Sequence, residues 1–590
     1  MLQQARTLLK RHFGYDAFRP GQEKIIESLL AGRDTVGIMP TGGGKSICYQ
    51  IPALLLPGLT VVISPLIALM KDQVDNLQNL GIAATFINSS LDSDEADLRI
   101  QRMNRGDFKL IYLAPERLES PHFRHLLQRL PVSLIAVDEA HCVSQWGHDF
   151  RPSYLTIASL VADYPRRPRV AAFTATATEY VTEDIIRHLG LQAAQIFATG
   201  FDRPNLSFRV IRGENKKDFL IRYLEANRER AGIVYTATRR EADQLQEYLV
   251  RKGFRAGRYH AGLEDMERAR AQDAFLYDNT RIMVATNAFG MGIDKSNVRF
   301  VIHYNMPKNM ESYYQEAGRA GRDGEPAECI LLFSARDINT QKFLIEQNQA
   351  TPERKSMEHR KLQSMIDYCH TPRCLRSHIL HYFGEEAPEE CGNCSTCADD
   401  AEPVDITTEA QKIFSCIVRM QERFGMNLVA EVLKGSKSKK LAQTGFERLS
   451  TYGLMKEYTI KEITDMINIL TAEGYLFVTE GAFPVVRLLE KAVPVLKGRE
   501  KVFLKVRKRA SRLEADSDLF EHLRRLRKTI ADRDGVPPYI VFPDSTLREM
   551  SQRLPLDRMS LRAISGVGET KLERYGDAFL EEIRRHTTGA

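Results

Sequence analysis

The sequence predicts a multidomain protein that begins with two tandem α/β domains, each built on a parallel sheet, and continues into mainly helical domains. Three observations support this prediction. Short β-rich runs alternate with helical patterns through the first 200 residues or so, which is typical of a parallel sheet covered by helices. The same rhythm restarts near Leu206. After Arg336 it fades into helical patterns and a cysteine cluster.

The composition fits several globular domains without a membrane segment. A chain of 590 residues has room for roughly three to five domains. Hydrophobic residues make up 43% and charged residues 27%, as in ordinary globular proteins. The net charge is only +6, and basic residues concentrate late in the chain. The N-terminus lacks a signal-peptide pattern, and prolines interrupt the apolar run from Ile51 to Met70, so we expect no membrane span.

The first domain, residues 1–200, is expected to bind a nucleotide. Its predicted strands are Thr35–Met39, Val61–Ser64, Lys109–Leu113, Ser133–Val137 and Val170–Thr174. Glycines after the first strand let backbone amides approach phosphate oxygens, the Lys45 ammonium can reach the β- and γ-phosphates, and the Ser46 hydroxyl can bind Mg²⁺. Met39 stands where the strict pattern has glycine. The residues expected to bind ATP are Thr41, Gly42, Gly43, Gly44, Lys45 and Ser46.

An acidic motif, Asp138-Glu-Ala-His141, follows the fourth predicted strand. Ligands of open α/β sheets bind at the carboxyl ends of the strands. Asp138 is therefore expected to hold Mg²⁺ and Glu139 to polarise an attacking water, with His141 completing a catalytic motif. An acidic pair alone is more often a solvated strand end. Its occurrence together with the predicted phosphate-binding loop indicates a catalytic role.

A candidate adenine site lies near the N-terminus, in Phe13-Gly-Tyr-Asp-Ala-Phe-Arg-Pro-Gly-Gln22. The side-chain amide of Gln22 is suited to reading an adenine edge with two hydrogen bonds. Tyr15 or Arg19 would stack on the base.

The second α/β domain, residues 201–340, is expected to complete the ATP site. Its predicted strands are Gly232–Tyr235, Arg255–Tyr259, Arg281–Ala285, Phe300–His303 and Cys329–Phe333. Arg319 and Arg322, in Gln315-Glu-Ala-Gly-Arg-Ala-Gly-Arg322, are three residues apart and can point together across a cleft toward a γ-phosphate. The segment 198–205 is interpreted as a hinge. A nucleotide held between two such domains closes them when it binds and opens them after hydrolysis.

Residues 341–403 are expected to hold one structural zinc ion. Cys374 precedes Cys391-Gly-Asn-Cys-Ser-Thr-Cys397, and two overlapping Cys-x-x-Cys units wrap a tetrahedral ion. An iron–sulfur cluster and unliganded thiols are the alternatives. Cys369, His370 and His378 are rival ligands nearby.

These motifs, in their order and spacing, resemble the RecQ family of superfamily 2 DNA helicases. Further matching pieces are Val61-Val-Ile-Ser-Pro-Leu-Ile-Ala-Leu-Met-Lys-Asp-Gln73, Thr174-Ala-Thr-Ala177 and Val284-Ala-Thr-Asn-Ala-Phe-Gly-Met-Gly-Ile-Asp294. The resemblance implies two RecA-like domains, a helical zinc-binding region, a winged-helix domain at 404–492, a basic linker at 493–515 and a small all-α HRDC-like domain at 516–590. Phe483 is placed at the wing tip. Whether it separates strands stays open.

The resemblance is most specific in the aromatic loop, residues 141–152, which holds Trp146, the only tryptophan. Polar neighbours favour an exposed loop over a core position. In RecQ-like proteins this loop senses single-stranded DNA and couples it to hydrolysis. The residues expected to contact DNA are Trp146, His148, Phe150 and Arg151, with Tyr539 of the HRDC-like domain as a further stacking candidate and ordinary packing as its alternative. Gly566 and Gly568 are expected to present amides to phosphate.

The resemblance therefore implies an ATP-dependent helicase that moves 3′→5′ on single-stranded DNA and unwinds duplex, forked or structured DNA in recombination, repair and replication restart. Its cofactors would be ATP, Mg²⁺ and one Zn²⁺. We expect a cytoplasmic, nucleoid-associated monomer that meets DNA and single-stranded-DNA-binding protein. An RNA helicase is the first alternative, because the acidic motif also occurs there. A junction-binding scaffold with an inactive ATPase is the second.

Overall fold

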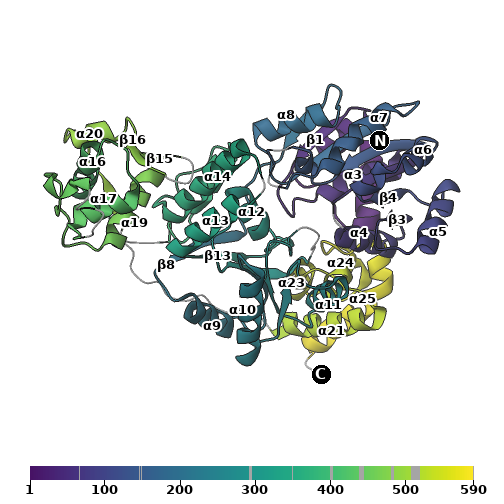
Figure 1. Ribbon diagram of the computed structural model, residues 1–590. Helices are drawn as coiled ribbons and strands as arrows, with labels where there is room; N and C mark the ends of the chain where they lie inside the picture. Colours follow the sequence, from purple (N-terminus) through teal and green to yellow (C-terminus); the bar gives the residue numbers. More distant parts are fainter. Residues whose placement is uncertain are drawn as a thin grey trace.

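The computed structural model describes residues 1–65, 67–144, 146–147, 149–290, 295–348, 350–398, 403–437, 441, 444–479, 484–505 and 518–588. They form two α/β lobes, a helical region with the cysteine cluster, a small winged domain and a C-terminal helical bundle (Figure 1). The predicted fold class is confirmed. Among the described residues, no helix combines the length and apolar character that a membrane span requires.

Lobe 1 contains a parallel seven-stranded sheet in the order β3-β4-β2-β5-β6-β1-β7. Its strands are β1 (Thr35–Ile38), β2 (Leu59–Ile63), β3 (Ala84–Ile87), β4 (Leu110–Leu113), β5 (Val132–Val137), β6 (Arg169–Thr174) and β7 (Gln195–Ala198). Its helices are α1 (Leu2–Leu8), α2 (Gln22–Leu30), α3 (Lys45–Leu55), α4 (Ile67–Asn79), α5 (Ser93–Asn104), α6 (Pro121–Gln128), α7 (Thr156–Ala162) and α8 (Glu179–His188). The five expected strands are present, and β3 and β7 are additional.

Lobe 2 repeats the design with a parallel six-stranded sheet in the order β10-β11-β9-β12-β13-β8. Its strands are β8 (Leu206–Arg212), β9 (Ala231–Tyr235), β10 (Ala256–Tyr259), β11 (Ile282–Ala285), β12 (Val298–His303) and β13 (Ala327–Phe333). Its helices are α9 (Lys216–Ala226), α10 (Arg239–Arg251), α11 (Asp265–Leu276), α12 (Met310–Ala317) and α13 (Ala335–Gln347). All five expected strands are present, and β8 is additional.

The zinc-binding region consists of α14 (Pro352–His370), α15 (Leu375–Tyr382) and the cysteine segment. The winged domain follows, with its own apolar core. Its elements are β14 (Pro403–Asp405), α16 (Thr407–Arg419), α17 (Met426–Lys434), α19 (Ile460–Ala472), β15 (Leu476–Val478), β16 (Val486–Leu488), α20 (Ala492–Leu496) and β17 (Phe503–Lys505). β15 and β16 form an antiparallel hairpin, but Phe483 lies outside the described residues. β17 pairs with β14, so the packed domain extends into the expected linker, as far as Lys505.

The C-terminal bundle, residues 518–588, has its own core and packs against both lobes (Figure 1). Its helices are α21 (Asp518–Asp534), α22 (Pro538–Val541), α23 (Asp544–Arg553), α24 (Arg558–Arg562) and α25 (Glu569–Thr588). On lobe 1, the Gly566 amide donates to the Gly14 carbonyl at 3.4 Å. On lobe 2, the Tyr277 hydroxyl donates to the Gly535 carbonyl at 2.8 Å. The bundle therefore bridges the two lobes.

Candidate nucleotide and DNA site

The phosphate-binding loop, residues 41–46, joins β1 to α3 at the carboxyl edge of the first sheet. Gly42 and Gly44 have φ values of 80° and 82°, which favour glycine. A Cβ at Gly44 would lie 2.3 Å from Nε2 of Gln22. The Gln22 side chain donates to the Gly44 carbonyl at 3.0 Å and accepts from the Arg19 amide at 2.8 Å. The Arg19 guanidinium also donates to the Gly42 carbonyl, so two of the three adenine-site candidates are joined directly to this loop.

Asp138 and Glu139 follow β5 and face this loop. The Asp138 amide donates to the Ile63 carbonyl at 2.8 Å, which extends the pairing of β5 with β2. Glu139 has a φ of 47°, a strained value for a residue with a side chain. Lys45 Nζ lies 3.9 Å from Glu139 Oε1. Burial, reinforced by the charge of Glu139, raises the pKa of Asp138 to about 6. A bound cation would offset this cost of holding two carboxylates in a buried place.

His141 links the acidic pair to the end of β6. Its Nδ1 lies 3.0 Å from Thr174 Oγ1 and 3.4 Å from Glu139 Oε2. Burial, together with repulsion by Lys45 and other nearby cations, lowers the pKa of His141 to about 3. His141 is therefore neutral at physiological pH and acts here as a hydrogen-bonding link.

Lobe 2 closes directly on the phosphate-binding loop. The Arg203 guanidinium donates to the Thr41 carbonyl of lobe 1 and to three carbonyls of lobe 2, those of Gly318 (3.2 Å), Ala320 (3.1 Å) and Gly321 (2.7 Å). A Cβ at Gly318 would lie 3.1 Å from the Thr41 Cβ. The turn that carries the two predicted arginines is thus packed against the predicted phosphate-binding loop.

Arg319, the residue after Gly318, is buried, with only 4% of its surface exposed. Burial lowers its pKa, and repulsion by Arg322 adds to the effect. Among the described residues, the Nε of Arg319 has no hydrogen-bond partner. Arg322 approaches Gly42 so closely that a Cβ on that glycine would lie 3.5 Å from the Arg322 Cα. Since a buried guanidinium requires anionic partners, these cations around Lys45 fit the polyphosphate of a nucleotide.

The structure therefore brings the predicted residues of lobe 1 and lobe 2 into one site. Arg203 is a residue that sequence reasoning missed. It lies in the segment 198–205, interpreted only as a hinge, and its contacts depend on how the two lobes pack. No local pattern in the sequence marks it out from other basic residues.

The four predicted cysteine ligands form one cluster. The sulfur atoms of Cys374, Cys391, Cys394 and Cys397 lie within 4.8 Å of one another. Four thiolates without a carboxylate suit zinc. Of the rivals, Cys369 is fully buried, and His370 points its Nδ1 to the Ile366 carbonyl at 2.9 Å. The chain therefore has one structural zinc site, as predicted.

The zinc site is tied to the hinge. The Ser395 amide donates to the Phe208 carbonyl on β8 at 2.8 Å. The Asn393 side chain donates to the Pro204 carbonyl at 3.2 Å. Arg376, near the start of α15, is 2.5 Å from an Asp202 carboxylate oxygen. The cysteine segment thus fixes the backbone that follows Arg203, and Arg376 of α15 holds the Asp202 side chain that precedes it.

The aromatic loop lies beside the acidic motif, between the two lobes' ATP-site elements and α14. The Trp146 ring packs edge-on against Tyr180 of α8, with centroids 5.8 Å apart. Arg151 donates to the Pro65 carbonyl at 3.1 Å and pairs with Asp149 at 3.1 Å. Phe150 is partly exposed. The predicted contact His148 lies outside the described residues.

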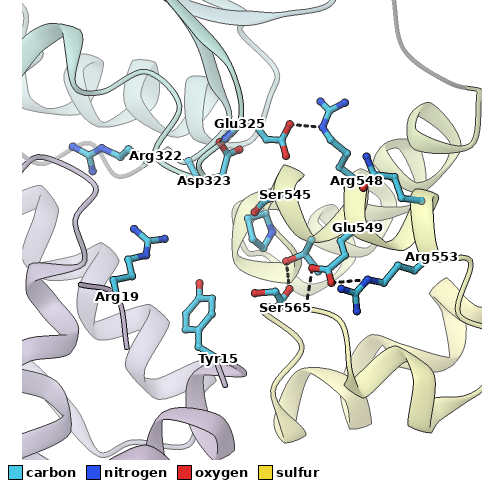
Figure 2. A pocket seen from close by; sticks show the side chains of 14 residues that line it. Tyr15, Arg19, Arg322, Asp323, Glu325, Ser545, Arg548, Glu549, Arg553 and Ser565 are labelled. Carbon is cyan, nitrogen blue, oxygen red and sulfur yellow. Dashed lines mark hydrogen bonds and ion pairs between the residues drawn. The ribbon is translucent and has the colours of Figure 1, made fainter. Parts of the chain in front are cut away.

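A cavity of about 590 Å³ lies where the two lobes and the bundle meet (Figure 2). Tyr15 and Arg19 line it from lobe 1, Arg322 from lobe 2, and Arg553 from the bundle. Tyr539 lies elsewhere in the bundle. It packs between the apolar core of the bundle and the large apolar core that runs through the two lobes and the zinc-binding region. The structure thus groups Tyr15 with the nucleotide site and does not group Tyr539 with the aromatic loop.

Comparison with known families divides the chain into five matched regions. They are DEAD/DEAH box helicase (residues 19–185), helicase conserved C-terminal domain (215–324), RecQ zinc-binding (335–398), RQC domain (400–513) and HRDC domain (516–583).

Named relatives match this chain along nearly its whole length. The ATP-dependent DNA helicase RecQ of Bacillus subtilis (strain 168) is 51% identical over 587 residues, which cover 99% of this chain and 99% of that protein. The protein of the same name from Pasteurella multocida is 41% identical, covering 99% and 94%. The RecQ-like DNA helicase blm-1 of Caenorhabditis elegans is 32% identical, covering 97% and 65%.

Proposed function

The chain belongs to the RecQ family of ATP-dependent DNA helicases, and from this premise we propose that it moves 3′→5′ along one DNA strand and unwinds duplex, forked or otherwise structured DNA. The polarity rests on the family resemblance. The roles in recombination, repair and replication restart, and a cytoplasmic location at the nucleoid, rest on the same resemblance.

We propose that lobe 1 supplies the groups that position the reacting atoms. Lys45 binds the β- and γ-phosphates, and Glu139 orients the attacking water and accepts its proton. Ser46 and Asp138 would hold Mg²⁺, which neutralises phosphate charge when bound. The residues fit this task because Lys45, Asp138 and Glu139 face one another at the end of one sheet.

Lobe 2 supplies positive charge for the transition state. Arg322 packs against Gly42 of the predicted phosphate-binding loop, and Arg319 follows Gly318, which meets Thr41 of that loop. Arg203 bridges the two lobes beside them. An arginine supplied across such a cleft accelerates nucleotide hydrolysis by roughly 10³- to 10⁵-fold in related chemistry. Hydrolysis and product release would loosen this contact, and alternating grips on DNA would then move the strand.

DNA is proposed to control hydrolysis through the aromatic loop. Base stacking on an aromatic side chain is worth roughly 1–3 kcal/mol, and opening a DNA base-pair step costs about 1.4 kcal/mol. Stacking on Trp146 or Phe150 can therefore trap a newly separated base. It cannot alone give direction, which must come from the ATP cycle. We expect Trp146→Ala to bind ATP normally and to lose stimulation by single strands, measured as ATPase rate against DNA concentration.

The observation that carries the proposal is the contact of the second lobe with the predicted phosphate-binding loop of the first. Arg203 donates to the Thr41 carbonyl, and Arg322 packs against Gly42. The test compares 3′-tailed and 5′-tailed DNA duplexes, and matching RNA duplexes, under one salt condition. We expect ATP-dependent unwinding of the 3′-tailed DNA. Preferential unwinding of 5′-tailed DNA or of RNA would contradict the proposal. Glu139→Gln is the matched control and should bind ATP while hydrolysing it about 10²- to 10⁴-fold more slowly.

The partners and assembly state belong to the same proposal. We expect a monomer on light scattering, and direct binding to single-stranded-DNA-binding protein from the same organism, measured by calorimetry.

A further inference from the structure

Lys361 connects the aromatic loop to α12, the helix that precedes Arg319. Lys361 lies on α14, in the zinc-binding region. Its ammonium is 2.6 Å from Glu311 Oε1 on α12 of lobe 2, and it donates to the Trp146 carbonyl of lobe 1 at 3.2 Å. The Lys361 and Glu311 side chains are only 18% and 7% exposed, so water weakens this ion pair little. Three parts of the molecule therefore meet at one side chain.

Glu311 lies where a change in its ion pair with Lys361 can be transmitted toward the ATP site. It stands in the first turn of α12, and Arg319 follows two residues after the last residue of that helix, Ala317. The hydroxyl groups of Tyr313 and Tyr368 lie 3.0 Å apart, which fixes α12 to α14 a second time. Because a packed helix moves as a unit, a shift at Glu311 also reaches the turn that holds Arg319.

The aromatic loop is only loosely packed on the α14 side. A cavity of about 30 Å³, large enough for one water molecule, lies between Gly147 and α14. Arg354, Met357 and Lys361 of α14 line it. On its other side the Trp146 ring rests on Tyr180, which is itself 53% exposed. Close packing does not lock the loop here, so the bond to Lys361 matters for its position.

The charge of Lys361 is also felt at the acidic motif. Burial lowers the pKa of His141 to about 3, with Lys45, Arg151 and Lys361 contributing in that order. Lys361 is therefore close enough to influence both the loop and the residues that precede it.

We propose that Lys361 is a positioning residue that couples the aromatic loop to α12, and through α12 to Arg319. The proposal rests on the proposed role of the loop in sensing DNA. When a base draws Trp146 away from Tyr180, the Trp146 carbonyl leaves the Lys361 ammonium, which then pairs with Glu311 alone. The change at Glu311 is passed along α12 to the arginine turn. Lys361 itself touches neither nucleotide nor reacting atoms.

The first experiment replaces Lys361 by methionine, which keeps the length of the side chain and removes its charge. We expect unstimulated ATP hydrolysis to stay within twofold and stimulation by single-stranded DNA to fall about tenfold, the size expected for one charge-assisted hydrogen bond. Lys361→Arg keeps both contacts within reach and should restore most of the stimulation. Lys355→Met is the matched control, because Lys355 lies on the same helix and pairs with the exposed Glu346 at 3.7 Å.

The fluorescence of Trp146 gives a readout that would not change if Lys361 only stabilised the fold. Because Trp146 is the only tryptophan, fluorescence excited where tyrosine does not absorb reports this loop alone. Without DNA, Lys361→Met should lower the anisotropy and shift the emission to the red, because the loop loses its tether. Glu311→Gln separates the two contacts: the anisotropy should stay at the wild-type value, while stimulation by DNA falls.

The outcomes separate this inference from the proposed function. Wild-type stimulation and anisotropy in Lys361→Met, with stimulation lost in Trp146→Ala, overturn the role of Lys361 and leave the aromatic loop as the DNA sensor. Full stimulation in both variants overturns the sensor itself. The inference is also overturned if Lys355→Met reduces stimulation as much as Lys361→Met does. The effect would then belong to α14 in general and not to Lys361.

Discussion

At the scale of single residues, Arg203 is the clearest link between the lobes. It donates to Thr41 of one lobe and to three carbonyls that surround the arginine turn of the other. Burial lowers the pKa of this guanidinium, with Arg322 also repelling it. Such a site needs the flat, forked donor set of arginine, because a lysine ammonium cannot reach several carbonyls in two directions.

We therefore expect Arg203→Lys to lose most of its DNA-stimulated ATPase activity. Loss of two charge-assisted hydrogen bonds, each worth about 1.5–3 kcal/mol, would lower kcat by about 100-fold or more. Steady-state ATPase assays with saturating single-stranded DNA measure the effect. Arg209→Lys is the control, because that arginine forms a partly exposed pair with Glu328 in the same lobe. Arg203→Lys with kcat within twofold of wild type would contradict the prediction.

The functional residues that could be predicted from the sequence are those that their immediate neighbours in the chain identify. Lys45 and Ser46 are recognisable because a glycine-rich turn between strand and helix already specifies a phosphate site. Glu139 is recognisable in a similar way, because it follows directly after a buried strand and the Asp138 next to it. Arg203 and Lys361 act only through contacts between segments far apart in the chain, and no local spacing distinguishes them from other basic residues.

At the scale of elements, the zinc-binding segment acts as a clamp on the hinge. Asn393 and Ser395 bond to Pro204 and Phe208, in the segment directly after Arg203, whose side chain turns toward the ATP site. A structural zinc site contributes directly to folding free energy, at an apparent value of roughly 10–16 kcal/mol in small zinc-binding peptides. Its loss should therefore be felt in the hinge and not only locally.

Cys394→Ser should remove the zinc ion and impair ATP hydrolysis together. Elemental analysis should give one zinc per wild-type chain and none per variant, and thermal unfolding should begin at a lower temperature. The ATPase rate should fall even though no ATP-site residue has changed. Cys416→Ser, at a buried cysteine of the winged domain, controls for the same substitution elsewhere. A zinc-free variant with wild-type ATPase would show that the hinge does not depend on the clamp.

Strands were predictable where burial gives a strong pattern. Five strands in each lobe were expected and found, and most of them are nearly continuous apolar runs. β10 is the exception, because its four residues are only half-buried and include Arg258. β7 was not expected, and three of its four residues are exposed at the sheet edge. β3 was also not expected, although its four residues are buried.

At the scale of the whole molecule, the C-terminal bundle holds the two lobes together. Arg548 pairs with Glu325, next to the arginine turn of lobe 2 (Figure 2). Lys528 donates to Asn279 of the same lobe at 3.0 Å. The contact with lobe 1 combines close backbone packing at Gly14 with two side-chain bonds, from Lys10 to the Arg562 carbonyl at 3.4 Å and from Arg574 to Asn79 at 3.3 Å. An ion pair holds the bundle to lobe 2, and hydrogen bonds with close backbone packing hold it to lobe 1.

Glu325→Arg should release the bundle from lobe 2. Replacing an attractive pair by two facing guanidiniums costs more than the loss of one ion pair, so we expect the undocked population to rise about tenfold or more. Small-angle scattering should show a larger radius of gyration. The double exchange Glu325→Arg with Arg548→Glu should restore the compact form. Arg558→Glu, which breaks an exposed pair with Asp577 inside the bundle, should leave the radius unchanged. A double exchange as extended as Glu325→Arg would contradict this assignment.

The meeting of Gly14 and Gly568 has a consequence for exchanging parts between relatives. Gly14 has a φ of 77°, and a Cβ there would lie 2.5 Å from the Gly568 nitrogen. A Cβ on Gly568 would lie 3.0 Å from the His12 carbonyl oxygen. A bundle grafted from another helicase can seat on this chain only if both partners bring bare backbone to that junction. A methyl group on either surface would hold the graft off, however well its charges match.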